Sequence, residues 1–268
     1  MEQSINKGAL NAYQLKIIAI IGMTLQHSAI AIGYIMPLWL MFILQFAGGL
    51  TFPIMAYLLV EGYKYTKSKC KYILRILLVA LISHVPHMLV FGSFGFNIMY
   101  TLALGLIILV LNDKIKSRFL FYTIFVIFSI ISTALIFDWF VVGFIMILMI
   151  YKIKNKKRAI IASAVVAFIY YAIYSMFFII AYNNLEYFPD EFAKTMNILG
   201  YDFILTMSVF GIGCLLTIPL LFKYNGRRGR SAKFLFYAFY PLHLIILVIL
   251  AVLLGINNFD MWFSLYFI

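Results

Sequence analysis

Four histidines are the side chains of this sequence best suited to chemistry, and all four lie in apolar stretches. His27, His84 and His243 each follow, by nine to eleven residues, the basic residue at the start of their stretch. At 1.5 Å per helical residue they lie about 15 Å from that residue, near the middle of a bilayer core of about 30 Å. His87 lies one helical turn further. A neutral imidazole accepts and returns protons, so this layer predicts acid–base or nucleophilic chemistry at mid-membrane.

Ionisable side chains inside a membrane are costly and are usually functional, whereas a lone buried histidine in a soluble core is more often a structural hydrogen-bonding group. His84 and His87 are three residues apart and share a helix face. Pro86 between them and Pro241 before His243 each remove a backbone hydrogen bond. Because no carboxylate stands near the histidines in the sequence, we expect no metal site.

Other polar residues accompany this layer. Gln26 adjoins His27, and a fourth apolar stretch opens with Asn97, Tyr100 and Thr101. Arg75 has two interpretations: its side chain either extends to the membrane surface or binds the phosphates of a nucleotide-like donor.

Composition defines the elements that must hold these residues. The 268 residues are 65% hydrophobic and 11% charged, with a mean hydropathy of +1.04. These values predict an all-α integral membrane bundle that forms one transmembrane domain over 1–268. We expect about nine spans, within a range of about eight to ten. They are 15–35, 38–62, 72–92, 97–112, 119–137, 139–152, 159–182, 202–222 and 233–254. The tail 259–268 is too short to cross.

The net charge of +12 follows from topology and not from a nucleic-acid partner. Of the 21 Lys and Arg residues, all but Lys194 fall on the side of the N-terminus or at its edge. This positive-inside pattern predicts a multi-pass protein of the plasma or inner membrane, with a cytoplasmic N-terminus and an external C-terminus. The outer segments carry the acidic residues Asp138, Glu186, Asp190, Glu191, Asp202 and Asp260. The outer loop 183–201 is either a solvated cap or a lid or docking surface. Cys70 and Cys214 suggest no disulfide framework.

Four stretches, in this order, resemble the TraX family. They are LKIIAIIGMTLQHSAI, GLTFPIMAYLLVEGYKYTKSKCKYILRILLVALIS, NIMYTLALG and FYAFYPLHL, which together run from near residue 10 to near residue 247. TraX proteins are similar to the larger group of membrane-embedded acyltransferases. The resemblance implies transfer of an acetyl group from cytoplasmic acetyl-CoA to an acceptor facing the other side, such as the N-terminal amine of pilin. A membrane histidine would act as general base or acyl carrier.

Position by position, the resemblance implies catalytic roles for His27 and His243, and it matches Asn97 and Thr101 to a polar motif of the family. In the mechanism that we expect, Asn97, Thr101 or Tyr100 donates a hydrogen bond to the developing oxyanion. Two departures stand out. The family commonly has Asp where this chain has Gln26, and Arg where it has Gly49. Gln26 can orient His27 but cannot stabilise an imidazolium as a carboxylate does.

We therefore expect an acetyl-CoA-dependent acyltransferase. The expected substrate-binding residues are Gln26, His84, His87, Tyr100 and Glu61. The expected donor-binding residues are Arg75 and Lys71, with the Arg227–Arg230 cluster beside them. The expected partners are the lipid bilayer and an amine- or hydroxyl-bearing acceptor, including a peptide N-terminus. Two alternatives stay open: a transporter with its substrate or proton site at the histidine layer, and a catalytically silent membrane partner. The sequence leaves open the acceptor, the acyl length and the oligomeric state.

Overall fold

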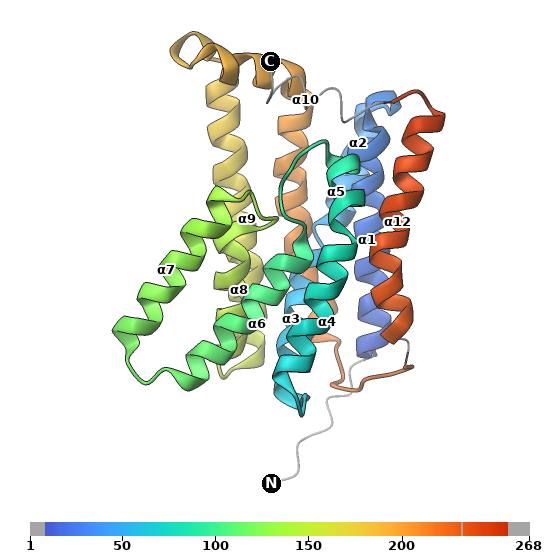
Figure 1. Cartoon of the computed structure of the whole chain (residues 1–268). Helices are drawn as coiled ribbons and strands as arrows, with labels where there is room; N and C mark the ends of the chain where they lie inside the picture. Colours follow the sequence, from blue (N-terminus) through green and yellow to red (C-terminus); the bar gives the residue numbers. More distant parts are fainter. Residues whose placement is uncertain (1–8, 232, 257–268) are drawn as a thin grey trace.

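The computed structural model describes residues 9–231 and 233–256, and its regular elements are helices. The predicted all-helical membrane fold is therefore confirmed, as Figure 1 shows. The helices in chain order are α1 (Ala12–Ile32), α2 (Leu38–Gly48), α3 (Thr51–Tyr65), α4 (Lys69–Ile82), α5 (His84–Phe91), α6 (Ile98–Lys114), α7 (Arg118–Ala134), α8 (Phe140–Lys152), α9 (Lys156–Tyr182), α10 (Asp190–Leu215), α11 (Thr217–Phe222) and α12 (Lys233–Leu253), with 3-10 turns at Gly33–Ile35 and Leu185–Tyr187.

The number of spans differs from the prediction. Within the described chain, five segments are long and apolar enough to cross a bilayer: α1, the joined α2 and α3, α9, Gly200–Phe222 and α12. Helices α4 and α5 make a sixth if the 47° bend between them lies within one span. The predicted count of about nine is not confirmed.

The three remaining predicted spans are short helices. Helices α6 and α7 have 17 residues each and α8 has 13. At 1.5 Å per residue they measure about 25 Å and 20 Å, less than a bilayer core of about 30 Å. Figure 1 shows them in the lower part of the bundle, with the α5–α6 and α7–α8 connections inside it.

These two inner connections, 92–97 and 135–139, pair with each other. The Phe96 N–H donates to the Ile136 carbonyl at 3.1 Å, and the Asp138 N–H donates to the Phe96 carbonyl at 2.9 Å. Irregular backbone at membrane depth is tolerated only where protein or a cavity surrounds it, because lipid offers no hydrogen bonds. The pairing meets that requirement and fixes Asp138 within the bundle.

The backbone around Asp138 is strained. Ile136, Trp139 and Phe140 have φ angles of 51°, 65° and 32°. Positive φ is uncommon for residues other than glycine and is a genuine outlier for a β-branched side chain. Such strain persists only where the surroundings hold it, and here the pairing with Phe96 does so.

Close helix contact explains one departure from the resemblance. A Cβ atom added to Gly49 would lie 2.4 Å from the Phe210 carbonyl oxygen of α10. Opposite it, a Cβ on Gly213 would lie 2.0 Å from the Phe46 oxygen. Small residues let transmembrane helices approach this closely. An arginine at position 49 would therefore require α10 to move away.

One end of the bundle is basic. It carries the connections 66–68, 115–117, 153–155 and 223–231, which lie at the bottom of Figure 1. We call it the basic end. Four helices are tied together there by Asp113. Its Oδ2 accepts hydrogen bonds from the Tyr63 hydroxyl at 2.7 Å and from Lys69 Nζ at 3.0 Å, and its Oδ1 accepts from the Tyr151 hydroxyl at 2.7 Å.

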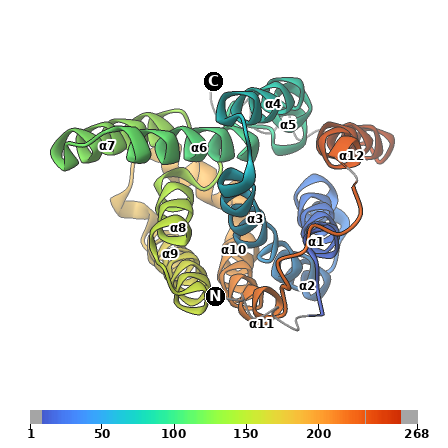
Figure 2. The same cartoon turned by 90° about the horizontal axis from the view of Figure 1, so that it is seen from below.

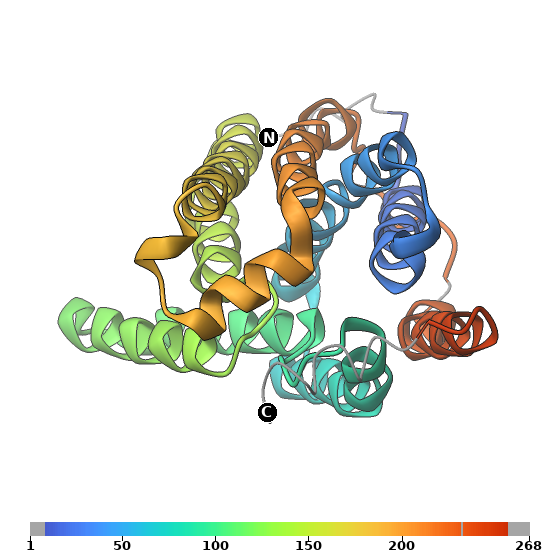
Figure 3. The same cartoon turned by 90° about the horizontal axis from the view of Figure 1, so that it is seen from above.

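The opposite end is partly covered by α10. This helix breaks at Gly200, whose φ is 74°. Its first part lies across the end of the bundle, as Figure 3 shows from above. The predicted outer loop 183–201 is therefore mostly helical.

Helix α12 stands at the edge of the bundle, as Figure 2 shows from below. It packs on α1, α4 and α5 and continues through Pro241. The predicted interfacial tail 259–268, with Asp260, lies outside the described residues.

Candidate active site

The site is built around a pair of histidines from α1 and α12. His27 Nδ1 and His243 Nε2 lie 2.9 Å apart, and the two side chains come from positions 216 residues apart in the chain. Both are buried, with 6% and 4% of their surface exposed. On the other side of the His243 ring, Nδ1 lies 3.0 Å from the Phe239 carbonyl oxygen.

These contacts define the protonation of a neutral pair. A carbonyl oxygen only accepts, so His243 Nδ1 carries the proton that bonds to Phe239. His243 Nε2 is then the acceptor, and His27 Nδ1 must donate to it. This leaves His27 Nε2 with an unprotonated lone pair, the form required of a general base or a nucleophile. The chain of hydrogen bonds thus orients His27 and sets its tautomer.

Phe91 and His87 continue the cluster toward α5. The Phe91 ring meets the His27 ring edge-on, with centroids 5.1 Å apart, and stacks on His87 at 4.3 Å. His87 Nε2 lies 3.3 Å from Asp138 Oδ2, an ion-pair distance without the alignment of a hydrogen bond. Sequence analysis placed Asp138 in an outer segment. In the structure, the connection that carries Asp138 pairs with residues 92–97 and holds its carboxylate against His87.

The side chains of Asn97 and Thr101 form hydrogen bonds with the backbone of neighbouring segments. Asn97 caps α6, since its Oδ1 accepts from the Met99 N–H at 3.1 Å while its Nδ2 donates to the Ala80 carbonyl at 2.9 Å. The Thr101 hydroxyl donates to the Asp138 carbonyl. Its single proton is therefore used within the protein. Both side chains hold the connections that carry Asp138 and the start of α6.

The other predicted site residues are dispersed. His84 packs against Phe96 and Tyr100, with ring centroids 5.1 Å and 5.7 Å away. Glu61 forms a salt bridge of 3.4 Å with Lys64 at the basic end. Lys71 is exposed, and its backbone carbonyl accepts from Arg75.

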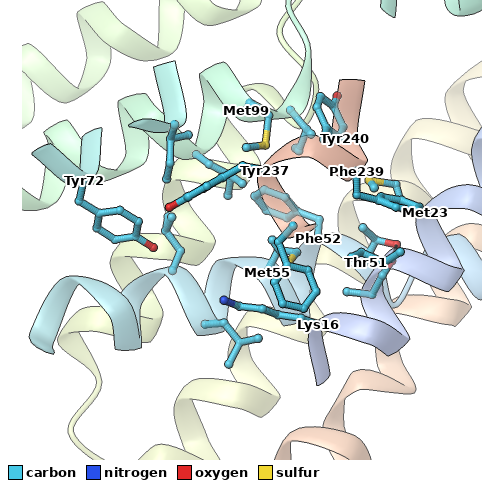
Figure 4. Close-up of a pocket in the computed structure, with 18 residues that line it drawn as sticks. Lys16, Met23, Thr51, Phe52, Met55, Tyr72, Met99, Tyr237, Phe239 and Tyr240 are labelled. Atoms are coloured by element: carbon cyan, nitrogen blue, oxygen red, sulfur yellow. Dashed lines mark hydrogen bonds between the residues drawn. The ribbon is translucent and has the colours of Figure 1, made fainter. Parts of the chain in front are cut away.

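Three cavities follow one another from the basic end to the histidine pair. The basic cavity, of about 310 Å³, shares Lys16, Tyr72, Phe236 and Tyr237 with the next one. That apolar cavity, of about 130 Å³, is shown in Figure 4. It shares Met23, Thr51, Phe52 and Ile98 with the histidine cavity, of about 200 Å³. Because neighbouring cavities share walls, they form a series through the bundle.

The ends of this series differ in chemistry. The basic cavity has four cationic side chains and no acidic one among its lining residues; the cations are Lys16, Arg75, Arg228 and Arg230. The histidine cavity contains His27, Gln26 and Asp138 among nine aromatic residues. These are Phe52, Phe91, Phe137, Trp139, Phe140, Tyr170, Tyr171, Tyr174 and Phe210. In the part of the chain that is described, no group of three or more His, Cys, Asp or Glu side chains could hold a metal ion.

Sequence reasoning missed Asp138 and Phe91. For Asp138 a signal was present. The stretch 139–152 that follows it would be about 21 Å long as a helix, too short to cross from an outer loop. Asp138 therefore had to lie below the outer surface. No local signal identified Phe91, whose role depends on the packing of α5 against α1.

Comparison with known proteins adds three findings. The family model described as TraX protein matches residues 11–251. The chain is 33% identical over 164 residues to the "Probable fimbrial assembly protein FimC, serogroup H1" of Dichelobacter nodosus. That match covers 56% of this chain and 66% of the relative, just under two thirds of its length. No solved structure matches.

Proposed function

Because this chain belongs to the TraX family, we propose that it is a membrane-embedded acyltransferase. In this proposal it moves an acetyl group from cytoplasmic acetyl-CoA to an amine or hydroxyl of an acceptor at or beyond the outer face. One observation carries the proposal: His27, which His243 orients, lines the last of three neighbouring cavities, the first of which is lined by a cluster of cations. The name of the fimbrial relative supports a role in pilus or fimbrial assembly, with an acceptor among the fimbrial subunits.

The donor enters from the basic end, which faces the cytoplasm by the positive-inside rule. Lys16, Arg75, Arg228 and Arg230 neutralise the phosphates of CoA, and arginine suits phosphate because of its fork of N–H donors. The thin pantetheine arm passes through the apolar cavity. Eleven helical residues separate Lys16 from His27, or about 16 Å, which is within reach of an extended arm.

The chemical step uses the lone pair of His27 Nε2. This nitrogen removes a proton from the acceptor amine or hydroxyl as the nucleophile attacks the thioester carbonyl carbon. The new C–N or C–O bond forms, the C–S bond breaks, and the proton on His27 passes to the departing thiolate. The products are the acetylated acceptor and free CoA thiol. His243 and the Phe239 carbonyl hold His27 in the reactive tautomer throughout.

The lining of the histidine cavity favours an amine over a hydroxyl. A cation is attracted to the faces of aromatic rings, and the cavity has nine aromatic residues with one carboxylate, that of Asp138. An ammonium group can bind there and release one proton to bulk water. The neutral amine then attacks, and its second proton is the one that His27 takes. A hydroxyl acceptor would gain nothing from this arrangement.

The test is acetyl transfer by the purified protein. Radiolabelled acetyl-CoA is mixed with peptides that differ only in a free or a blocked N-terminal amine. We expect His27→Ala to lower the rate by about 10²–10⁴-fold, the usual contribution of general acid–base catalysis. His84→Ala is the matched control, because it removes a histidine of similar depth that does not line the cavity series, and it should retain the rate.

Two results would contradict the proposal. One is transfer that His27→Ala and His243→Ala leave unchanged. The other is histidine-dependent uptake of solute into proteoliposomes without any acetylated product, which would identify a transporter.

A further inference from the structure

Acyl transfer needs a hydrogen-bond donor for the oxyanion that forms on the thioester oxygen, usually one of the largest contributions to catalysis. From the sequence we expect Asn97, Thr101 or Tyr100 in this role, but Tyr100 lines none of the three cavities. The side chains of Asn97 and Thr101 are used elsewhere, on the Ala80 carbonyl and the Asp138 carbonyl. A different donor must serve if the chain works as proposed.

Tyr240 has a buried hydroxyl whose proton has no acceptor among the described residues. The side chain is 3% exposed, and its oxygen faces the Ile98 N–H. A buried polar group without a partner is costly, and in a native structure it needs an explanation. Tyr240 lines the apolar cavity, and Figure 4 shows it at the upper edge of the view, on the side opposite Lys16.

Tyr240 lies close to the His27–His243 pair. It lies one turn before His243 on α12, and the two ring centroids are 5.5 Å apart. Its hydroxyl is next to the backbone amide of Ile98, the first residue of α6. The first N–H groups of a helix have no intrahelical partner, and the end of the helix that carries them favours negative charge.

Ile98 lies in the wall that the apolar cavity and the histidine cavity share, on the route that the proposed thioester would take. His27 lines the second of these cavities. A thioester carbonyl bound beside Ile98 would lie between the cavity that His27 lines and the cavity that Tyr240 lines. The N-terminus of α6 would lie next to the Tyr240 hydroxyl.

We propose that the Tyr240 hydroxyl, supported by the N-terminus of α6 at Ile98, is the oxyanion donor of this enzyme; this inference rests on the proposed acyl transfer. When the nucleophile attacks, the electron pair of the C=O double bond moves onto oxygen. Tyr240 donates a hydrogen bond to that oxygen and keeps its proton. The electron pair then re-forms the double bond as the thiolate leaves. Tyr240 is a catalytic residue in this scheme, since it touches the reacting oxygen.

The experiment compares Tyr240→Phe with Tyr57→Phe in the acetyl-transfer assay. Tyr57 is also buried, at 4% exposure, but it lines none of the three cavities. Loss of one oxyanion donor lowers kcat by about 100-fold or more. We expect that loss for Tyr240→Phe, with the KM for acetyl-CoA and the thermal shift produced by CoA unchanged. Tyr57→Phe should retain kcat.

A third variant guards against a folding defect. 3-Fluorotyrosine at position 240 keeps an O–H group and makes it a stronger donor, so kcat should match or exceed that of the wild type. Transfer by Tyr240→Phe within about threefold of the wild-type rate would overturn the inference. Loss of activity in both the fluorotyrosine and phenylalanine proteins would also overturn it, because packing and not hydrogen bonding would then matter. A wild-type protein without any His27-dependent transfer would overturn the proposed function itself.

Discussion

At the scale of single residues, the tautomer and the orientation of His27 depend on two groups behind it, His243 and the Phe239 carbonyl. In the neutral pair, His27 Nε2 is unprotonated because the proton of His27 is on Nδ1, where it is donated to His243 Nε2. His243 Nε2 can accept it because the proton of His243 is on Nδ1, where it is donated to the Phe239 carbonyl. A backbone carbonyl cannot be removed by mutation or titrated. The orientation of the base therefore originates in the fold of α12.

Asp138 gives a prediction about the acceptor. Replacement of Asp138 by Asn keeps the backbone carbonyl that Thr101 binds but removes the negative charge from the histidine cavity. A hydrogen bond to a charged group contributes about 1.5–3 kcal/mol, so the KM for an amine acceptor should rise by about tenfold or more. The KM for acetyl-CoA, measured in the same steady-state assay, should stay constant.

A hydroxyl-bearing peptide is the control for this variant. Its KM should be equal for the wild type and Asp138→Asn, because a neutral acceptor gains little from the carboxylate. An unchanged KM for the amine would show that Asp138 does not bind the acceptor.

Depth along the chain placed His27 and His243 at one level, and the structure brings them into contact. The same argument failed for His84, which packs on Phe96 and Tyr100. Depth fixes one coordinate of a residue. The direction of its side chain depends on neighbouring helices that the sequence does not position.

At the scale of helices, the apolar pattern predicted the helices but not their depth. Helices α6, α7 and α8 are as apolar as spans, yet two connections turn back inside the bundle. Hydropathy does not report how far a segment crosses: α6 and α8 are apolar and bury much of their surface in the bundle, whereas most apolar side chains of α7 are exposed on its outside. The length of 139–152 was the better guide, because it does not depend on the surroundings.

The Asp113 cluster gives a prediction about pH. Partial burial acts to raise the pKa of the Asp113 carboxyl, but hydrogen bonds from Tyr63, Tyr151 and Lys69 outweigh it and hold that pKa below its ordinary value of 3.8. The ionised form is thus favoured in the folded state. Its contribution to stability is complete above the ordinary value and is lost as pH falls through the lower, folded-state value.

We therefore expect Asp113→Asn to lower the unfolding temperature in detergent at neutral pH. The difference from the wild type should shrink below about pH 4. Lys64→Met is the control, because Lys64 forms a single salt bridge at the same end and outside the cluster. A difference that stays constant down to the acid limit would show that Asp113 acts through packing and not through charge.

At the scale of the whole molecule, the three neighbouring cavities extend from a cationic site at the basic end to an aromatic site around His27. In the proposed function the donor would bind in the basic cavity, and the acceptor would bind among the aromatic rings of the histidine cavity. Two substrates could therefore reach one reaction centre from opposite faces without either one crossing the membrane. The acetyl group alone would change sides.

Cys70 offers a test of this orientation. It is exposed and belongs to α4 at the basic end. A thiol reagent that cannot cross membranes should leave it unlabelled in intact cells and label it in inverted vesicles. In a Cys70→Ser background, Asn183→Cys at the opposite end should show the reverse pattern. Labelling of Cys70 from outside would contradict the assigned topology.

The 216 residues between His27 and His243 also order events during synthesis. The base is made with the first helix, but the partner that sets its tautomer arrives with the last helix described. A nascent chain still held by the ribosome would carry an unoriented imidazole. Catalytic competence would thus begin only when insertion is essentially complete, so the enzyme could not modify acceptors from a half-built site.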